Sequence, residues 1–212
     1  MHVIPRPYAA VENLEVPMTT LNLEKIFNPQ RVAVVGAYDQ PTSSGSVVLR
    51  NLLVEGSQRV VYPISPTRES VHGVAAYPDI SSLPKQADLA VVCVEPEETP
   101  DVVAQCGEHG IGGLVILSKG YHSLVDEGRA LDNQIRQVSA SDPEMRILGP
   151  NSYGIIVPHL KLNVSTVASI PKPGHLAFVS QSRALTASTL DWALKEQVGF
   201  SNFVSLGDAV DV

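Results

Sequence analysis

The chain has 212 residues, of which 44% are hydrophobic and 17% are charged, so it can bury a core and is not intrinsically disordered. Its formal net charge of −7 disfavours a nucleic-acid partner, although a local anion site built from backbone N–H groups is compatible with it. Two cysteines, Cys93 and Cys106, make neither a disulfide framework nor a zinc site, which favours a reducing, cytoplasmic compartment.

Residues 1–20 are predicted to form an irregular arm. They contain Pro5, Pro7 and Pro17, which disfavour regular structure, and they lack the apolar segment of a secretory signal. No apolar run in the sequence approaches the roughly 18 residues of a membrane-spanning helix. We therefore expect a soluble cytoplasmic protein with no membrane partner.

Residues 22–157 alternate short apolar runs with helical patterns. The runs are rich in β-branched residues and cover 31–35, 59–62, 89–94, 113–117 and 146–148. Their hydrophobicity is continuous rather than alternating, which is typical of strands covered on both faces in a parallel sheet. Strands that alternate with helices predict an α/β domain of the doubly wound, Rossmann-like class.

Three helices are predicted between these strands. The first carries an apolar stripe over residues 48–53, and the third begins near Glu127. In the second helix, Thr99 is the predicted N-cap, Pro100 is the first helical residue, and Gly110 ends the helix.

A second strand–loop–helix unit is predicted over residues 172–212, after an irregular connector at 158–173. The unit has strands at 176–179 and 203–206 with one helix between them. Such a unit is too small to close a core by itself. It is expected either to pack on the first domain or to begin a further domain of a longer protein, and we favour the second interpretation.

The loop from Gly36 to Gly45 follows the first strand and opens the first helix. In open α/β sheets, ligands bind at the carboxyl ends of the strands. Backbone N–H groups and the positive end of a helix at this place bind anions such as a pyrophosphate. The alternative is that Gly36 and Gly45 only allow a tight turn and close packing of the helix on the sheet.

The loop lacks the signatures of the common nucleotide sites. A G-x-G-x-x-G fingerprint would need glycine where Tyr38 and Pro41 stand, and the Walker lysine pattern is absent. A NAD site expects an acidic residue after the second strand, whereas Arg68 is the nearest charge there. An arginine suits the ribose phosphate of NADP or of coenzyme A (CoA), but an exposed arginine is also commonly just solvated.

Several motifs follow one another along the chain. They are Val32–Ala37, Pro41-x-Ser43-x-Gly45, Val61–Pro66, Gly73-x-x-Ala76-Tyr77-Pro78 and Arg146–Gly154, followed by Phe178–Ser182 and Leu190–Ala193. In this order they resemble the CoA-binding domain of the NDP-forming acyl-CoA synthetase and succinyl-CoA synthetase α-subunit superfamily. The last two motifs resemble the start of its flavodoxin-like second domain, so the resemblance covers residues 22 to 212.

The resemblance implies a site for CoA or acyl-CoA. In it, Gly36, Ala37, Ser43 and Gly45 cradle the phosphates, and Tyr38 and Ser44 of the same loop belong to the site. The adenosine part is bordered by Ser65, Pro66 and Arg68, the adenine side is lined by Val94 and Pro96, and the thiol end lies near Asn151. No catalytic residue and no metal ligand are implied for this chain.

The resemblance also implies a parent protein that joins a carboxylic acid to CoA. Its reaction consumes ATP, with magnesium, and passes through an acyl phosphate and a phosphohistidine outside this chain. The implied partners are the CoA ligand and the remainder of the parent or an ATP-grasp subunit, with a homo-oligomer left open.

Two departures from the family pattern bear on function. Ser65-Pro66-Thr67 stands where the family usually has Asn-Pro-Lys, so the usual lysine contact is in doubt. Arg183 stands where ligases carry glycine, at a helix N-terminus that holds phosphate in those enzymes, and its side chain could fill that space. Because of Arg183, a second interpretation stays open, in which the chain is the acyl-CoA-sensing region of a protein-lysine acetyltransferase. A third, an NADP-binding oxidoreductase domain, is disfavoured by the missing fingerprint glycines.

None of the six histidines matches a motif, and we expect structural or surface roles for all of them. Cys93 falls in an apolar strand and Cys106 on the inner face of a helix, so both are predicted to lie in the core.

Overall fold

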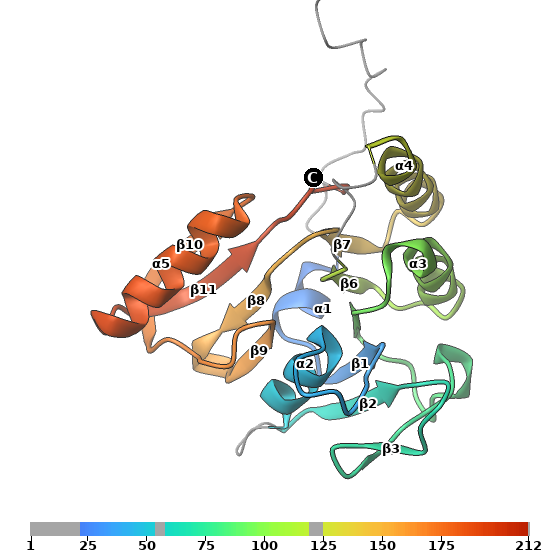
Figure 1. Cartoon of the computed structure of the whole chain (residues 1–212), viewed down its shortest axis with the longest axis horizontal. Helices are drawn as coiled ribbons and strands as arrows, with labels where there is room; N and C mark the ends of the chain where they lie inside the picture. The colour runs from blue at the N-terminus through green and yellow to red at the C-terminus, as the bar shows by residue number, and fades with distance from the viewer. Residues whose placement is uncertain (1–21, 54–57, 119–124, 212) are drawn as a thin grey trace, which may run out of the picture.

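The computed structural model describes residues 22–53, 58–118 and 125–211, and the predicted N-terminal arm lies outside them. The described residues form an α/β structure with a five-stranded sheet, a four-stranded sheet and a two-stranded hairpin (Figure 1). Among these residues, no helix has both the length and the apolar character that a membrane crossing requires.

The five-stranded sheet is entirely parallel, as the continuous apolar runs predict. Its strands are β1 (Arg31–Val35), β2 (Val60–Ile64), β5 (Leu89–Val92), β6 (Gly113–Ile116) and β7 (Arg146–Leu148). Their order across the sheet is β2-β1-β5-β6-β7. The edge strand β2 runs through Pro63, past the predicted end at residue 62, because an edge position tolerates a residue without an N–H group.

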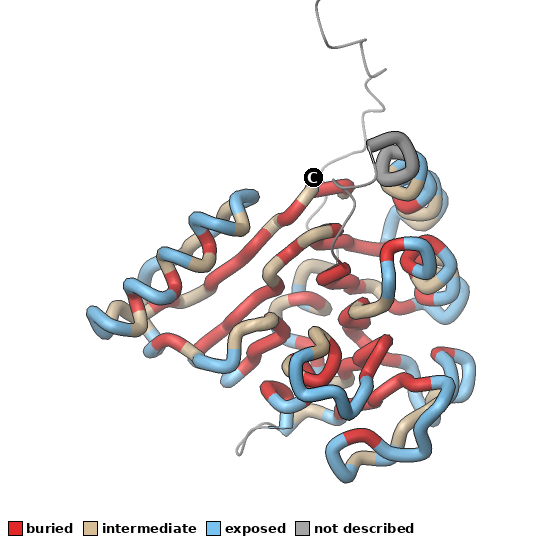
Figure 2. The backbone as a smooth tube through the Cα atoms, in the orientation of Figure 1, coloured by how far each residue is buried: buried red, intermediate tan, exposed pale blue. Residues whose placement is uncertain are grey.

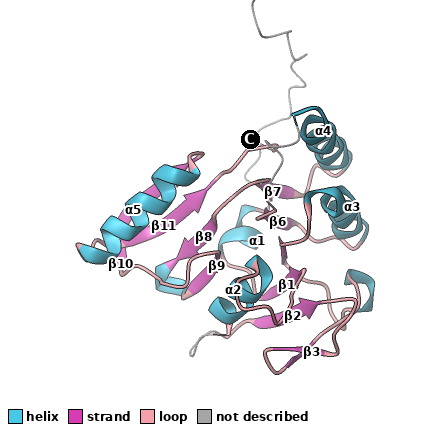
Figure 3. Cartoon of the chain, viewed as in Figure 1, coloured by secondary structure: helices cyan, strands magenta, loops and turns pink. Residues whose placement is uncertain are grey.

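Helices cover both faces of this sheet (Figure 3). The helices are α1 (Leu23–Phe27), α2 (Ser44–Leu52), α3 (Thr99–Glu108) and α4 (Val125–Ser141). Alternate residues of β1 face opposite sides: Val32 and Val34 pack with α1 and α2, and Ala33 and Val35 pack with α3 and α4. The strands are therefore buried on both sides, as Figure 2 shows, which confirms the doubly covered sheet.

The start of α3 differs from the prediction by one residue. Thr99 is the first helical residue rather than the N-cap, and Pro100 is the second. The reason is a 3-10 turn over 96–98 that leads directly into the helix, so the Thr99 hydroxyl donates back to the carbonyl oxygen of Glu95 at 3.1 Å. The end of the helix is as predicted, because Gly110 follows the C-cap with a φ of +67°.

The four-stranded sheet has the order β10-β11-β8-β9. Its strands are β8 (Gly154–Val157), β9 (Leu162–Ser165), β10 (Pro173–Ser180) and β11 (Phe200–Ser205). β10 and β11 are parallel, and the other two pairs are antiparallel. Helix α5 (Arg183–Lys195) packs on one face of this sheet through Leu190 and Ala193, which meet Ile156 and Phe203.

The stretch over 158–173 is not the irregular connector that the sequence predicted. It contains strand β9, and β8, which lies inside the range predicted for the first domain, pairs with β11 of the second unit. The cause is packing: the other face of β8 and β9 carries Ile155 and Val164 into the core under α2. The second unit thus completes its sheet with strands from the preceding segment.

The remaining elements are short. They are the hairpin strands β3 (Ser70–Val71) and β4 (Val74–Ala75) and the 3-10 helices η1 (Ile80–Ser82), η2 (Pro96–Glu98) and η4 (Pro158–Leu160).

Candidate functional site

The carboxyl ends of all five parallel strands meet at one edge of the first sheet. From β1 the chain passes to β2 on one side, and β5 pairs with the other side of β1. The gap between the ends of β1 and β5 is therefore the topological switch point, where α/β sheets bind ligands.

Gly36 lies directly at this switch point. Its φ is +82°, and a Cβ placed on it would come within 2.9 Å of the carbonyl oxygen of Cys93 and 3.2 Å of Val94 Cγ1. The N–H groups of Gly36 and Ala37 both donate to the carbonyl oxygen of Ile64, at 3.2 and 3.1 Å. Gly36 thus joins the ends of β1, β2 and β5, and because its N–H is engaged within the chain, a phosphate would need donors from further along the loop.

Helix α2 offers such donors at its first turn. The Ser43 side chain is the N-cap and accepts from the N–H of Ser46 at 3.3 Å, while Ser44 and Gly45 supply the other N–H groups of that turn. A Cβ on Gly45 would overlap the carbonyl oxygen of Gly36. Gly45 therefore allows the helix to begin against the backbone of the loop, which is the packing role that the sequence left as an alternative.

Ser65 follows β2 at the same edge and is buried. Its N–H donates to the carbonyl oxygen of Tyr77 at 2.9 Å, but its hydroxyl oxygen has no hydrogen-bond partner in the described parts of the chain. Tyr38, in the loop after β1, and Pro66 and Arg68, in the turn after β2, are exposed. Burying a hydroxyl without a hydrogen-bond partner costs free energy, so the Ser65 hydroxyl is suited to form a hydrogen bond with a ligand.

Val94 and Pro96 follow β5, across the switch point from the loop. Val94 is half-buried beside Gly36, and its carbonyl oxygen accepts from the Ser118 hydroxyl at 2.7 Å. Pro96 is buried at the start of the 3-10 turn before α3. The structure therefore brings Gly36, Ser65 and Val94 to neighbouring strand ends.

Asn151 lies at the same edge but over β6. Its φ is +57°, its N–H donates to the carbonyl oxygen of Ser118 at 3.0 Å, and a cis peptide joins Gly149 to Pro150 just before it. β6 is two strand positions from β1, or about 10 Å at the usual strand spacing. Asn151 can thus meet only an extended ligand that also reaches the loop after β1.

Arg183, the first residue of α5, reaches across to this turn. Its Nη1 donates to the carbonyl oxygens of Asn151 and Ser152, both at 2.9 Å, and its guanidinium carbon lies 4.5 Å from the centre of the Tyr153 ring. Burial lowers the pKa of Arg183, and the nearby charge of Asp208 opposes this. Arg183 thus connects the first residue of α5 to the turn at the carboxyl edge.

The cysteines play no visible part in this chemistry. Burial raises the pKa of both Cys93 and Cys106 to about 12, which keeps them as neutral thiols. Cys106 is buried in the core beneath α3, as the sequence predicts. Cys93 was expected in a buried strand, but β5 ends at Val92, so Cys93 is half-buried just after it and packs against the core on the other face of the sheet. Within the described residues, no group of three or more His, Cys, Asp or Glu could hold a metal ion.

His72 is a neighbour of the site that sequence reasoning missed. Its ring Nε2 lies 2.8 Å from the Ser46 hydroxyl oxygen, and its backbone N–H donates to the Asp39 carboxylate at 3.2 Å. Gly73 is the one turn residue in the sequence that indicates a hairpin here. Nothing in the sequence places that hairpin against α2.

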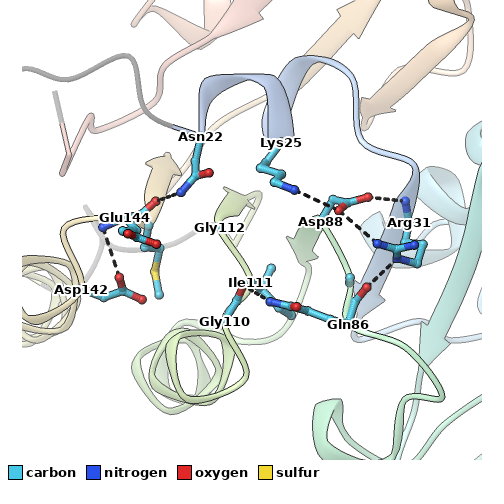
Figure 4. Close-up of a pocket in the computed structure, with 12 residues that line it drawn as sticks. Asn22, Lys25, Arg31, Gln86, Asp88, Gly110, Ile111, Gly112, Asp142 and Glu144 are labelled. Carbon is cyan, nitrogen blue, oxygen red and sulfur yellow. Dashed lines mark hydrogen bonds and ion pairs between the residues drawn. The ribbon is translucent and has the colours of Figure 1, made fainter.

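A cavity of about 260 Å³ lies at the opposite edge of the sheet, before the strands begin (Figure 4). Its charged and amide side chains are Asn22, Lys25, Arg31, Gln86, Asp88, Asp142 and Glu144. Asp88 pairs there with Lys25 at 3.3 Å and Arg31 at 3.6 Å. These polar groups bond to one another and so connect the elements around the cavity. The cavity is therefore not the predicted nucleotide site, which lies at the carboxyl edge.

Comparison with protein families agrees with this geometry. The model of the CoA binding domain matches residues 30–158, and that of the succinyl-CoA ligase like flavodoxin domain matches residues 173–212. The α subunit of acetate–CoA ligase [ADP-forming] II from Pyrococcus furiosus is 37% identical over 190 residues, which are 90% of this chain and 41% of that protein. The 4-hydroxybutyrate–CoA ligase [ADP-forming] of Nitrosopumilus maritimus is 35% identical over 185 residues, 86% of this chain and 26% of that protein.

A solved structure gives the same result. The dinucleotide forming acetyl-coenzyme A synthetase 1 of Ca. Korarchaeum cryptofilum, in complex with phosphate and ADP, superposes with a TM-score of 0.83 at 35% identity and covers 91% of this chain and 41% of that one. The chain thus spans less than half the length of these relatives. It belongs to the CoA binding domain family and corresponds to the CoA-binding part of the ADP-forming acyl-CoA synthetases.

Proposed function

We propose that the chain binds CoA or acyl-CoA at the carboxyl edge of the first sheet. The observation that carries the proposal is the buried Ser65 hydroxyl, which has no partner in the described residues and lies beside the switch point. Gly36, with no side chain, lets the ends of β1 and β5 approach each other closely, and the first turn of α2 supplies N–H groups for phosphate. Arg68, which is exposed after β2, would pair with the ribose phosphate that distinguishes CoA from NAD.

The parent protein, in this proposal, forms acyl-CoA from a carboxylic acid, CoA and ATP, with release of ADP and phosphate. The described residues would contribute binding and orientation. The loop and Ser65 would hold the nucleotide end, and Asn151 would meet the extended pantetheine arm. ATP and magnesium would be bound by the remainder of the parent or by an ATP-grasp subunit. A reducing cytoplasmic location is supported by the two free cysteines.

We also propose that the CoA-binding domain covers residues 22–157 and that the flavodoxin-like domain begins near 172. The match to the first family model ends at residue 158, and the match to the second begins at residue 173. The comparisons support neither the acetyltransferase sensor nor the NADP-binding oxidoreductase.

Calorimetric titration of the full chain tests the proposal. CoA and acetyl-CoA should bind with dissociation constants between micromolar and millimolar, which correspond to binding free energies on the order of 4–8 kcal/mol. NADP should not bind. The variant Arg68→Gln should weaken CoA but leave dephospho-CoA, which lacks the ribose phosphate, almost unchanged. Binding of NADP without CoA would show that the assignment is wrong.

A further inference from the structure

His72 occupies the tip of the β3–β4 hairpin. Its φ is +50° and that of Gly73 is +77°, so both residues of the two-residue turn have positive φ, as in a type I′ hairpin. The hairpin is attached to the sheet without His72, because Tyr77 bridges to Ile64 and donates its N–H to the carbonyl oxygen of Pro63 at 2.9 Å.

The two hydrogen bonds of His72 reach two different parts of the candidate site. Its ring bonds to Ser46, which is fully buried in the first turn of α2, and its N–H bonds to Asp39 in the loop after β1. A single residue therefore ties the loop to the start of the helix. The phosphate donors of the proposed site lie between these two points.

In the described part of the chain, the Ser46 hydroxyl has no side-chain or backbone partner other than the His72 ring. A buried hydroxyl that loses its partner costs free energy, so the fold favours the bond between Ser46 and His72. Asp39 contacts the backbone of His72 and not its ring, so the three residues do not form a nucleophilic triad.

We propose that His72 is a positioning residue for CoA binding, a role that rests on the function proposed above. It acts through Ser46 and Asp39: the two bonds fix the spacing between the loop and the first turn of α2, so that their N–H groups converge on the phosphates. Pre-organised donors bind an anion without a further ordering cost, and this is the advantage that the two bonds confer.

The test compares His72→Asn, Ser46→Ala and the double variant in the full chain, with His109→Ala as the control. Asparagine suits the positive φ of the turn but removes the ring, so the hairpin should remain folded. His109 is exposed at the end of α3, away from the carboxyl edge, and should leave affinity unchanged. Each single variant should weaken CoA binding about fivefold to tenfold, the value of roughly one hydrogen bond, with thermal midpoints close to that of the unmodified chain.

The double variant should bind CoA no more weakly than either single one, because both changes break the same bond. 3′-Phospho-ADP, which keeps the phosphates and lacks the pantetheine arm, should lose the same factor. If the unmodified chain binds CoA and His72→Asn binds it equally well, or if the two changes are additive, the inference is overturned while the proposed function stands. If the unmodified chain does not bind CoA, both are overturned.

Discussion

At the scale of single residues, Ser65 carries a hydroxyl group that the described chain buries without giving it a partner. Replacing it by alanine removes the desolvation cost and no internal hydrogen bond. Ser65→Ala should therefore unfold at the same temperature as the unmodified chain or a slightly higher one. CoA affinity should nevertheless fall severalfold, because the ligand loses a contact. Thermal denaturation and calorimetry together check this, and a lower midpoint with unchanged affinity would assign Ser65 a purely structural role.

Gly45 illustrates the opposite case, a site residue whose identity is set by packing. An added Cβ would overlap the backbone of Gly36, which cannot move aside as a side chain could. Gly45→Ala should cost about 1–3 kcal/mol of stability and weaken CoA binding through the displaced helix.

The matched control for Gly45 is Gly107→Ala, also within a helix. There the added Cβ would lie 3.0 Å from the flexible end of Met145 and in ordinary contact with Asp142 Oδ2 at 3.5 Å. Its stability should stay within about 1 kcal/mol of the unmodified value, or rise, because alanine favours a helix. Urea denaturation compares the two variants. Equal effects would argue against the backbone overlap as the cause.

Sequence reasoning could predict a glycine-containing loop at the switch point of the sheet, but not which of its N–H groups are bonded within the chain. Gly36 and Gly45 mark the loop because glycine is visible in a sequence, whereas the engagement of the Gly36 and Ala37 N–H groups by Ile64 depends on the neighbouring strand. His72 could not be predicted at all, since its contact with Ser46 joins elements 26 residues apart without a motif.

At the scale of elements, Asp88 fastens α1 and β1 to the start of β5. Burial alone would raise the pKa of its carboxyl, but the N–H groups of Arg31 and Gln30, together with Lys25, outweigh burial and lower it. A lowered pKa in the folded state stabilises the fold above the unfolded value of about 3.9. This stabilisation is lost as the pH falls through the folded pKa.

Asp88→Asn should therefore lower stability most at neutral pH, and its difference from the unmodified chain should shrink as the pH falls below about 4. Urea midpoints measured from pH 7 downward check this. Asp191→Asn is the control, because Asp191 pairs with Lys195 on an exposed helix face, where such pairs contribute little. A difference for Asp88→Asn that does not vary with pH would contradict the assignment.

The elements of the first sheet were predictable because their signal is local. Continuous apolar runs identified its five strands, and Gly110 identified the end of α3. β9 was missed because its residues, Leu162–Ser165, alternate apolar and polar side chains and form no continuous apolar run. The pairing of β8 with β11 joins segments about 50 residues apart, and no local pattern records it.

At the scale of the whole molecule, the turn from Gly149 to Tyr153 is the junction of the two sheets. Gly149 donates its N–H to the carbonyl oxygen of Leu206 at 3.0 Å, and the Ser152 hydroxyl donates to that of Ser205 at 2.5 Å. Arg183 adds its two bonds from α5. The second unit therefore supports Asn151, a candidate residue of the first, so the two family segments are expected to unfold together.

Phe203 provides the test of this coupling. It is buried in β11, stacks on Phe178 with ring centres 4.5 Å apart, and packs with Ile156 of β8. Phe203→Ala should cost about 3–5 kcal/mol, and hydrogen exchange should then rise in β8 and at the Gly149–Tyr153 turn as well as in β11.

CoA affinity of Phe203→Ala should also fall, since the turn that carries Asn151 loses its support. Trp192→Ala is the matched control: it is an aromatic residue of the same unit, but its side chain is 52% exposed on α5, and its loss should change stability little. Circular dichroism follows unfolding in both variants, because removal of the single tryptophan abolishes its fluorescence signal. If Phe203→Ala loosened only the second sheet and left the turn protected and CoA affinity intact, the two sheets would be independent. The bonds at Gly149 and Ser152 would then be contacts without a role in binding.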